Sequence, residues 1–128
     1  MSDQAAFLTS IKNGYTFKTE SVKIGIGMLD GKPVAGADVN LPLKTMNRHG
    51  LIAGATGTGK TKTLQMITEA LSNASVPVLV MDIKGDLSGL GAAGTVNDKI
   101  TSRCESIAIK FAPQAFPVEF MTLSNEKG

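Results

Sequence analysis

Adjacent basic residues, cysteines and long apolar runs are scarce in this sequence, and each scarcity argues against a class of protein. The thirteen lysines and arginines include no adjacent pair, so the sequence shows no basic stripe of the kind that binds nucleic acid. Cys104 is the only cysteine, which excludes an internal disulfide and fits a reducing compartment. No apolar run approaches the roughly 20 residues of a membrane span, and no signal peptide is visible. By elimination we expect a cytoplasmic protein without a membrane partner.

The overall composition is that of an ordinary soluble globular protein. Of the 128 residues, 42% are hydrophobic and 19% are charged. This length suggests one domain at most, with a modest core. Within it we expect two parts, a helix and β segment over residues 1–45 and the beginning of a larger α/β domain over residues 46–128.

The first part begins with a predicted amphipathic helix. Ser2 is a suitable N-cap, Asn13-Gly14 a stop, and one face of the helix is apolar at Phe7, Leu8 and Ile11. Apolar residues then alternate with lysine and glycine between residues 22 and 28, which is the period of a half-buried strand.

A hairpin turn is predicted directly after that strand. Asp30-Gly31 is a typical two-residue turn, although Pro33 leaves the start of the return strand open. Alternation resumes over residues 39–43, where Pro42 favours an edge strand.

The second part reads as a β-α-β unit. A short apolar strand over residues 51–53 leads into a glycine-rich loop, and a helix with one apolar face follows over residues 60–71. Residues 76–81 are a continuous apolar run, as expected of a strand buried on both faces. A right-handed crossover would make these two strands parallel, and further strands are predicted around residues 107–111 and 116–123.

The loop matches the Walker A pattern GxxxxGK[ST] with the residues GATGTGKT. Glycine permits the positive φ angles that turn several backbone N–H groups toward one polyphosphate, and the following helix directs its positive end at the same anion. We expect Lys60 to reach the β- and γ-phosphates as the catalytic cation and Thr61 to ligate Mg²⁺. The predicted nucleotide-binding residues are Gly54, Ala55, Thr56, Gly57, Thr58, Gly59, Lys60, Thr61 and Lys62.

Polar residues after the run 76–81 are secondary candidates. Asp82 has two interpretations: a role near the nucleotide, or capping of its own loop through the side chain. Lys84 and Asp86 lie at the carboxyl end of a predicted parallel strand, where ligands bind in open sheets, but a solvated turn explains them equally well.

Two stretches of the sequence resemble the bacterial HerA-like ATPases of the HerA–FtsK group of P-loop motors. These are LPLKTMNRHGLIAGATGTGKTKTLQ and VPVLVMDIKGDLSGL, within a similarity that covers about residues 20–123. The resemblance implies a RecA-like α/β core with a parallel sheet, ATP as substrate, and homo-oligomeric rings, typically hexamers. It also implies that Arg48 contacts nucleotide, within its own subunit or across a subunit boundary, although a plain surface charge is the competing interpretation.

The sequence departs from this family's pattern by ending early. The Walker B strand with its water-orienting glutamate and the arginine that acts across subunits are both missing, so we expect an N-terminal fragment of a longer protein. ATP hydrolysis, and DNA contacts if there are any, would then depend on parts outside this chain, with little turnover by the chain alone. The alternatives are a nucleotide-dependent switch or assembly module without DNA, or a small kinase, for which no arginine-rich lid is visible.

Overall fold

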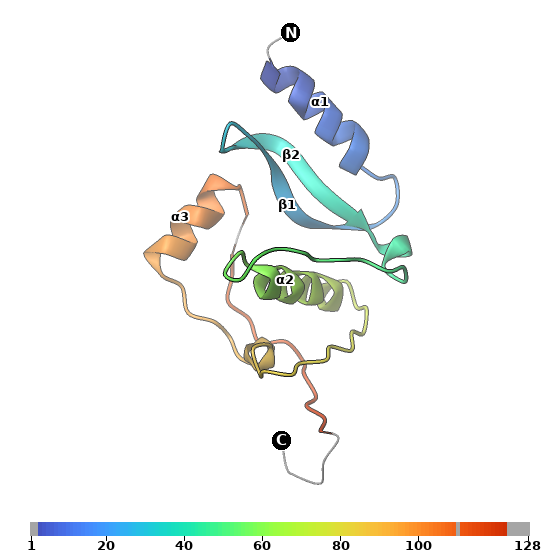
Figure 1. Cartoon of the computed structure of the whole chain (residues 1–128), viewed down its shortest axis with the longest axis vertical. Helices are drawn as coiled ribbons and strands as arrows, with labels where there is room; N and C mark the ends of the chain where they lie inside the picture. The colour runs from blue at the N-terminus through green and yellow to red at the C-terminus, as the bar shows by residue number, and fades with distance from the viewer. Residues whose placement is uncertain (1–2, 110, 123–128) are drawn as a thin grey trace.

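The first third of the chain folds as a helix lying on a β-hairpin (Figure 1). The computed structural model describes residues 3–109 and 111–122. Helix α1 spans Asp3–Tyr15, β1 spans Ser21–Leu29 and β2 spans Lys32–Pro42. A 3₁₀ turn over Leu43–Thr45 leads out of this unit, and the later elements are α2 at Lys60–Asn73, a 3₁₀ turn at Ser88–Gly91, and α3 at Asp98–Ser106.

The hairpin forms because its turn suits tightly twisted antiparallel strands. Asp30 and Gly31 have φ angles of 50° and 73°, the left-handed pair that two-residue hairpin turns require. Leu29 pairs with Lys32 directly across the turn, so the return strand starts well before residue 39. The predicted helix and hairpin are confirmed, while the proposed cap Ser2 lies outside the described residues.

Helix α1 sits on the hairpin because one strand residue lacks a side chain. A Cβ atom at Gly27 would lie 3.1 Å from the Phe7 ring and 3.2 Å from the Ala37 Cβ. Ala37, beside this contact, and Val34 are both buried, so the first apolar residues of the core belong to this unit. The predicted apolar face of α1 is therefore the one that packs, since Phe7, Leu8 and Ile11 are its only partly buried positions among the described residues.

Helix α2 is the centre of the rest of the structure (Figure 1). Its buried residue is Leu71, and Leu87 and Leu90 are buried in the segment that follows. The helix ends in a left-handed cap at Ser75, with φ 60°, and the Val76 amide donates to the Leu71 carbonyl at 2.9 Å. The predicted helix is thus confirmed and extends to Asn73.

The predicted parallel sheet of a RecA-like core is wrong for this structure. The only sheet among the described residues is the two-stranded antiparallel pair of β1 and β2. Residues 51–53 and 76–81 belong to no strand, and Leu51, Leu79 and Met81 are 89%, 84% and 85% exposed. Inner parallel strands are buried on both faces and paired on both edges. The two segments have the apolar composition of such inner strands. Among the described residues, however, no neighbouring strand pairs with them.

The two later strands also do not form in the described part of the chain. After α3, Ala108 adopts a left-handed φ of 51°, and the Ile109 amide donates back to the Cys104 carbonyl at 2.9 Å. The chain therefore turns where the third strand was predicted. Residues 116–122 are assigned to no strand, and Leu123 lies outside the described residues.

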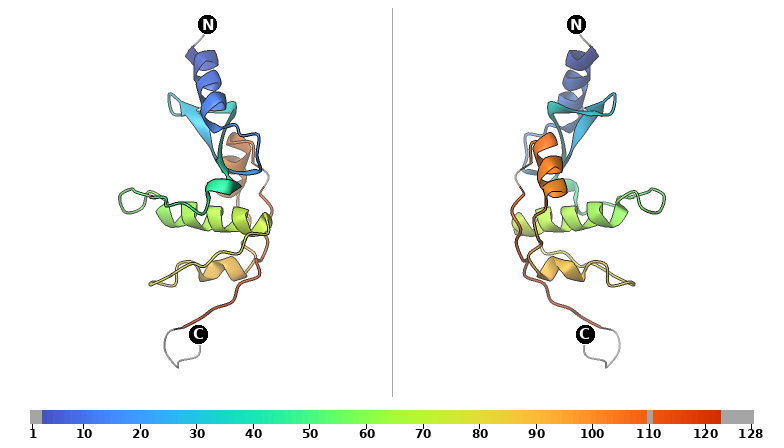
Figure 2. Two further views of the ribbon diagram at one scale, coloured as in Figure 1. Left: turned by 90° about the vertical axis from the view of Figure 1, so that its right-hand side faces the viewer. Right: turned by 90° about the vertical axis from the view of Figure 1, so that its left-hand side faces the viewer.

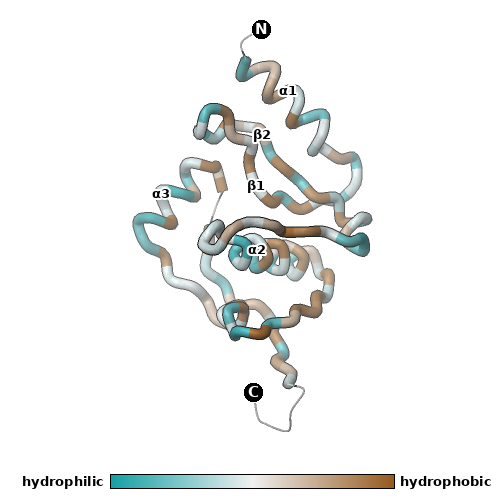
Figure 3. Tube along the Cα trace, in the orientation of Figure 1, coloured by the Kyte–Doolittle hydropathy of each residue, from teal (hydrophilic) through white to brown (hydrophobic). Residues whose placement is uncertain are grey.

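The extended segments on either side of α2 contain many apolar residues (Figure 3). No helix within residues 3–109 and 111–122 combines the length and hydrophobicity needed to cross a membrane.

Candidate phosphate-binding site

The glycine-rich loop between residues 54 and 59 enters α2 through two left-handed glycines. Gly57 has φ 82° and Gly59, the N-cap of α2, has φ 91°, angles that side chains other than glycine rarely adopt. Gly54 is needed for a different reason, because a Cβ there would lie 2.5 Å from the Thr58 hydroxyl. Each of these three glycines therefore meets a specific steric demand of the loop.

Donors inside the loop converge on one carbonyl oxygen. The Lys60 ammonium and the Thr58 hydroxyl each donate to the Ala55 carbonyl at 2.8 Å, and the Thr58 amide reaches the same oxygen at 3.4 Å. Lys60, the first residue of α2, thus folds back over the loop. Its positive charge lies above the backbone that would surround an anion.

The loop is open to solvent at the start of α2. Residues 51–59 are exposed, as are Thr61 and Lys62, while Lys60 is half-buried. The first N–H groups of a helix have no partner within the helix and carry its positive dipole end, a favourable environment for an anion. Figure 2 shows the loop projecting beyond this end of α2. An incoming phosphate therefore meets amides, an ammonium group and little steric obstruction.

Thr61 and Lys62 occupy the first turn of α2. The Lys62 ammonium donates to the Gln65 side-chain oxygen at 2.8 Å, so it lies along the helix. Partial burial raises the pKa of Glu69 on the same polar side of α2, and the positive charge of Lys62 opposes that rise. The described residues contain no group of three histidine, cysteine or acidic side chains that could hold a metal ion. Mg²⁺ commonly takes only one or two protein ligands beside substrate phosphates, so a single hydroxyl at Thr61 fits it.

Asp82 caps its own loop. Its carboxylate accepts hydrogen bonds from the amides of Leu87 at 2.7 Å, Gly85 at 3.0 Å and Lys84 at 3.1 Å. Above all the Leu87 bond lowers the pKa of this carboxyl, because it favours the charged form. Of the two interpretations of Asp82, the structure has the capping one; a role near the nucleotide stays a prediction.

The remaining candidates lie on the surface. Lys84, Asp86 and Arg48 are all exposed, and Arg48 is held in a turn by its amide, which donates to the Thr45 carbonyl at 3.0 Å. Sequence reasoning missed Gln65, whose side-chain nitrogen donates to the Asp86 carbonyl at 2.9 Å. Its helical position gives no hint of a partner 21 residues away.

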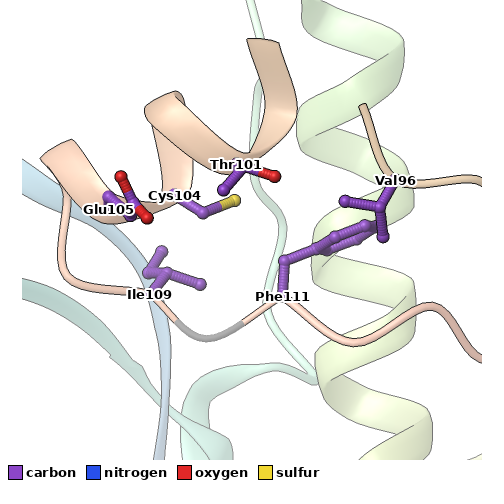
Figure 4. A pocket seen from close by; sticks show the side chains of 6 residues that line it. All are labelled: Val96, Thr101, Cys104, Glu105, Ile109 and Phe111. Atoms are coloured by element: carbon purple, nitrogen blue, oxygen red, sulfur yellow. The ribbon is translucent and has the colours of Figure 1, made fainter. Parts of the chain in front are cut away.

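A separate small cavity lies beside α3 (Figure 4). Its volume is about 170 Å³, and Thr101, Cys104 and Glu105 of α3 face Ile109, Phe111 and Val96 across it. None of the candidate phosphate-binding residues lines this cavity.

Comparison with known proteins identifies the family. The family model described as "Helicase HerA-like C-terminal" matches residues 28–128, a span that begins in β1 and includes the phosphate-binding loop and the Asp82 turn. Neither a curated protein nor a solved structure matches the chain. Because the family match covers well over half of its residues, the chain belongs to the HerA-like helicase C-terminal family.

Proposed function

We propose that residues 54–62 bind the phosphates of ATP together with Mg²⁺, as the nucleotide-binding part of a HerA-like ATPase. The observation that carries this proposal is the loop itself. Two left-handed glycines, an exposed helix N-terminus and a lysine folded over the loop occur together at the Walker A pattern.

Each part of the loop has a distinct role in this proposal. Backbone amides of the loop and of the first turn of α2 hold phosphate oxygens, and the Lys60 ammonium neutralises charge on the β- and γ-phosphates. The Thr61 hydroxyl is the protein ligand for Mg²⁺, whose bound form supplies further charge neutralisation on the phosphates. Lys62, beside them, adds positive charge at the entrance.

The choice of ATP and the link to DNA depend on family membership. HerA-like members of the P-loop group are expected to act as ring-shaped motors or helicases on DNA. We therefore propose ATP hydrolysis coupled to work on DNA, in an assembly that supplies a water-orienting glutamate and an arginine finger. The 128-residue chain alone should bind nucleotide weakly and turn it over negligibly.

A titration of the chain with Mg-ATP tests the site. Lys60→Ala removes a charge-assisted contact with phosphate, which should weaken binding roughly tenfold to a hundredfold. Lys99→Ala is the matched control, because Lys99 is an exposed lysine on α3, far along the chain from the loop. Omitting Mg²⁺ should weaken binding in the wild type. The absence of saturable binding, or equal binding by Lys60→Ala and wild type, would refute the proposal.

A nucleotide-dependent switch or assembly module is the second candidate. Phosphate binding by residues 54–62 would serve a switch as well as a motor, and the Asp82 carboxylate, considered for a role at the nucleotide, holds three amides of its own turn instead. Measuring ATP turnover by the whole protein with and without DNA separates the two candidates. A motor should turn over ATP faster with DNA, whereas a switch should be indifferent to it.

A further inference from the structure

The polar side of α2 connects the phosphate-binding loop to a distant turn through one glutamine. The Lys62 ammonium donates to the Gln65 side-chain oxygen at 2.8 Å, and the Gln65 side-chain nitrogen donates to the Asp86 carbonyl at 2.9 Å. Because both ends of the Gln65 amide are used, its orientation is fixed: the oxygen faces the ammonium and the nitrogen faces the carbonyl. Lys62 lies in the first turn of α2, within the loop's own set of candidate residues.

The turn over residues 82–87, called the capped turn below, is a preformed unit. The Asp82 carboxylate holds three of its amides, and Leu87 at its end is buried. The Ser88 hydroxyl adds a bond to the Gly85 carbonyl at 2.9 Å. A turn that is already ordered internally can be placed by a single outside contact, and the Gln65 bond to Asp86 is such a contact.

The capped turn and the phosphate-binding loop lie at the same end of α2. Gln65 follows Lys60 by five positions, which is roughly 7.5 Å along a helix axis. Figure 2 shows both segments projecting on the same side of the molecule, beyond the start of α2. The exposed side chains of Lys84 and Asp86 are therefore carried on a turn that flanks the loop.

We propose that Gln65 is a positioning residue, which holds the capped turn beside the phosphate-binding loop and transmits occupancy of the loop to that turn. The inference rests on the proposed function. An ammonium group has three donors, so Lys62 can contact a phosphate oxygen and Gln65 at once. Fixing Lys62 in this way stabilises the Gln65 amide further in the orientation that donates to Asp86. Polyphosphate in the loop thereby holds the capped turn more firmly in its place beside the loop.

Amide hydrogen exchange of the full chain, with and without Mg-ATP, tests this inference. Gln65→Glu removes the donor but keeps the length and the contact with Lys62, and Gln65→Met removes the donor without adding charge. Thr68→Ala is the control on the same helix. Without nucleotide, the amides of Lys84, Gly85 and Leu87 should exchange about three- to tenfold faster in both Gln65 variants, the effect of one lost hydrogen bond. Unchanged exchange of the α2 amides near Leu71, as well as at the β1–β2 hairpin, shows that the variants are folded.

The nucleotide-dependent part separates transmission from simple stabilisation. Mg-ATP should slow exchange of the same three amides in wild type and in Thr68→Ala, and should leave it unchanged in both Gln65 variants, whose affinity for Mg-ATP stays within about threefold of wild type. Slowing that persists in the variants, or equal exchange in all proteins without nucleotide, overturns the inference. If wild type binds no Mg-ATP, the proposed function fails, and the nucleotide-free comparison still decides whether Gln65 positions the turn.

Discussion

Asp82 and Asn97 show how short polar side chains hold the backbone that follows them. Asn97 is the N-cap of α3 and accepts a hydrogen bond from the Ile100 amide at 3.0 Å. Asp82 does more, because its carboxylate serves three amides and so defines the whole capped turn. A charged acceptor makes these bonds stronger than neutral ones, and it also makes them dependent on pH.

The first prediction concerns the titration of Asp82. Its pKa lies below the ordinary 3.8, mainly because the Leu87 amide donates to the charged form. The stabilisation of the turn by this carboxylate is thus fully present above pH 3.8 and is lost as pH falls through the lower folded pKa. In an NMR titration, the Leu87 amide shift should change with an inflection below pH 3.8, and Asp82→Asn should abolish it. An inflection at or above 3.8 would contradict the assignment.

Residues whose role is local were predictable, and those with distant partners were not. Gly57 and Gly59 adopt positive φ angles in a loop whose pattern requires flexible backbone, and Lys60 begins the helix as expected. These features follow from spacing along the chain. The contact of Gln65 was not predicted because it is a hydrogen bond to the Asp86 carbonyl. The helical pattern of α2 does not indicate a partner so far along the chain. Whether the loop residues bind nucleotide stays a prediction.

At the scale of elements, helices and the hairpin were predicted because their hydrogen bonds are short in sequence. The β1–β2 pair closes through a two-residue turn, and α2 ends where Ser75 takes a left-handed conformation. The prediction of parallel strands was wrong because an apolar run indicates only that a segment suits a buried environment. It does not show that neighbouring strands are present to pair with it. Parallel pairing needs partners across a crossover, and the described residues provide none for residues 51–53 or 76–81.

The second prediction compares two leucines on the same helix. Leu71 is 7% exposed, whereas Leu64, two turns earlier on the same face of α2, is 36% exposed. Leu71→Ala should lower the free energy of unfolding by about 2–3 kcal/mol, because it leaves a cavity among buried groups, and Leu64→Ala by about 1 kcal/mol or less. Urea denaturation followed by circular dichroism measures both. Equal losses for the two variants would show that α2 does not pack through Leu71.

The whole molecule exposes far more surface than its mass requires. Its accessible area is 10096 Å², whereas a folded monomer of 13.3 kDa exposes roughly 6,500 Å². Exposed apolar side chains in the extended segments around α2, among them Leu51, Leu79 and Met81, contribute to this area (Figure 3). Buried apolar residues are few among the described residues: Val22, Val34 and Ala37 in the hairpin, Leu71 in α2, and Leu87 and Leu90 after it.

The third prediction concerns Leu79, Met81 and Ile83, three large apolar side chains that lie close together in the sequence where an extended segment enters the capped turn. Ile83 is 100% exposed, and the other two are nearly so. Apolar side chains grouped in this way favour self-association. Replacing all three by serine should reduce association in light scattering at raised protein concentration. It should alter the free energy of unfolding by only about 0.5 kcal/mol per site, because exposed positions lose little packing.

A buried leucine near the same segment provides the contrast. Leu90 is buried, and its carbonyl accepts a hydrogen bond from the Phe116 amide at 3.0 Å, so it joins two distant segments. Leu90→Ser should destabilise the chain by more than 2 kcal/mol, because a hydroxyl replaces buried apolar volume, and should increase association by exposing apolar residues that are buried in the wild type. If the triple serine variant associates as strongly as wild type, residues 79–83 do not drive self-association. Exposed apolar side chains in other segments must then cause it.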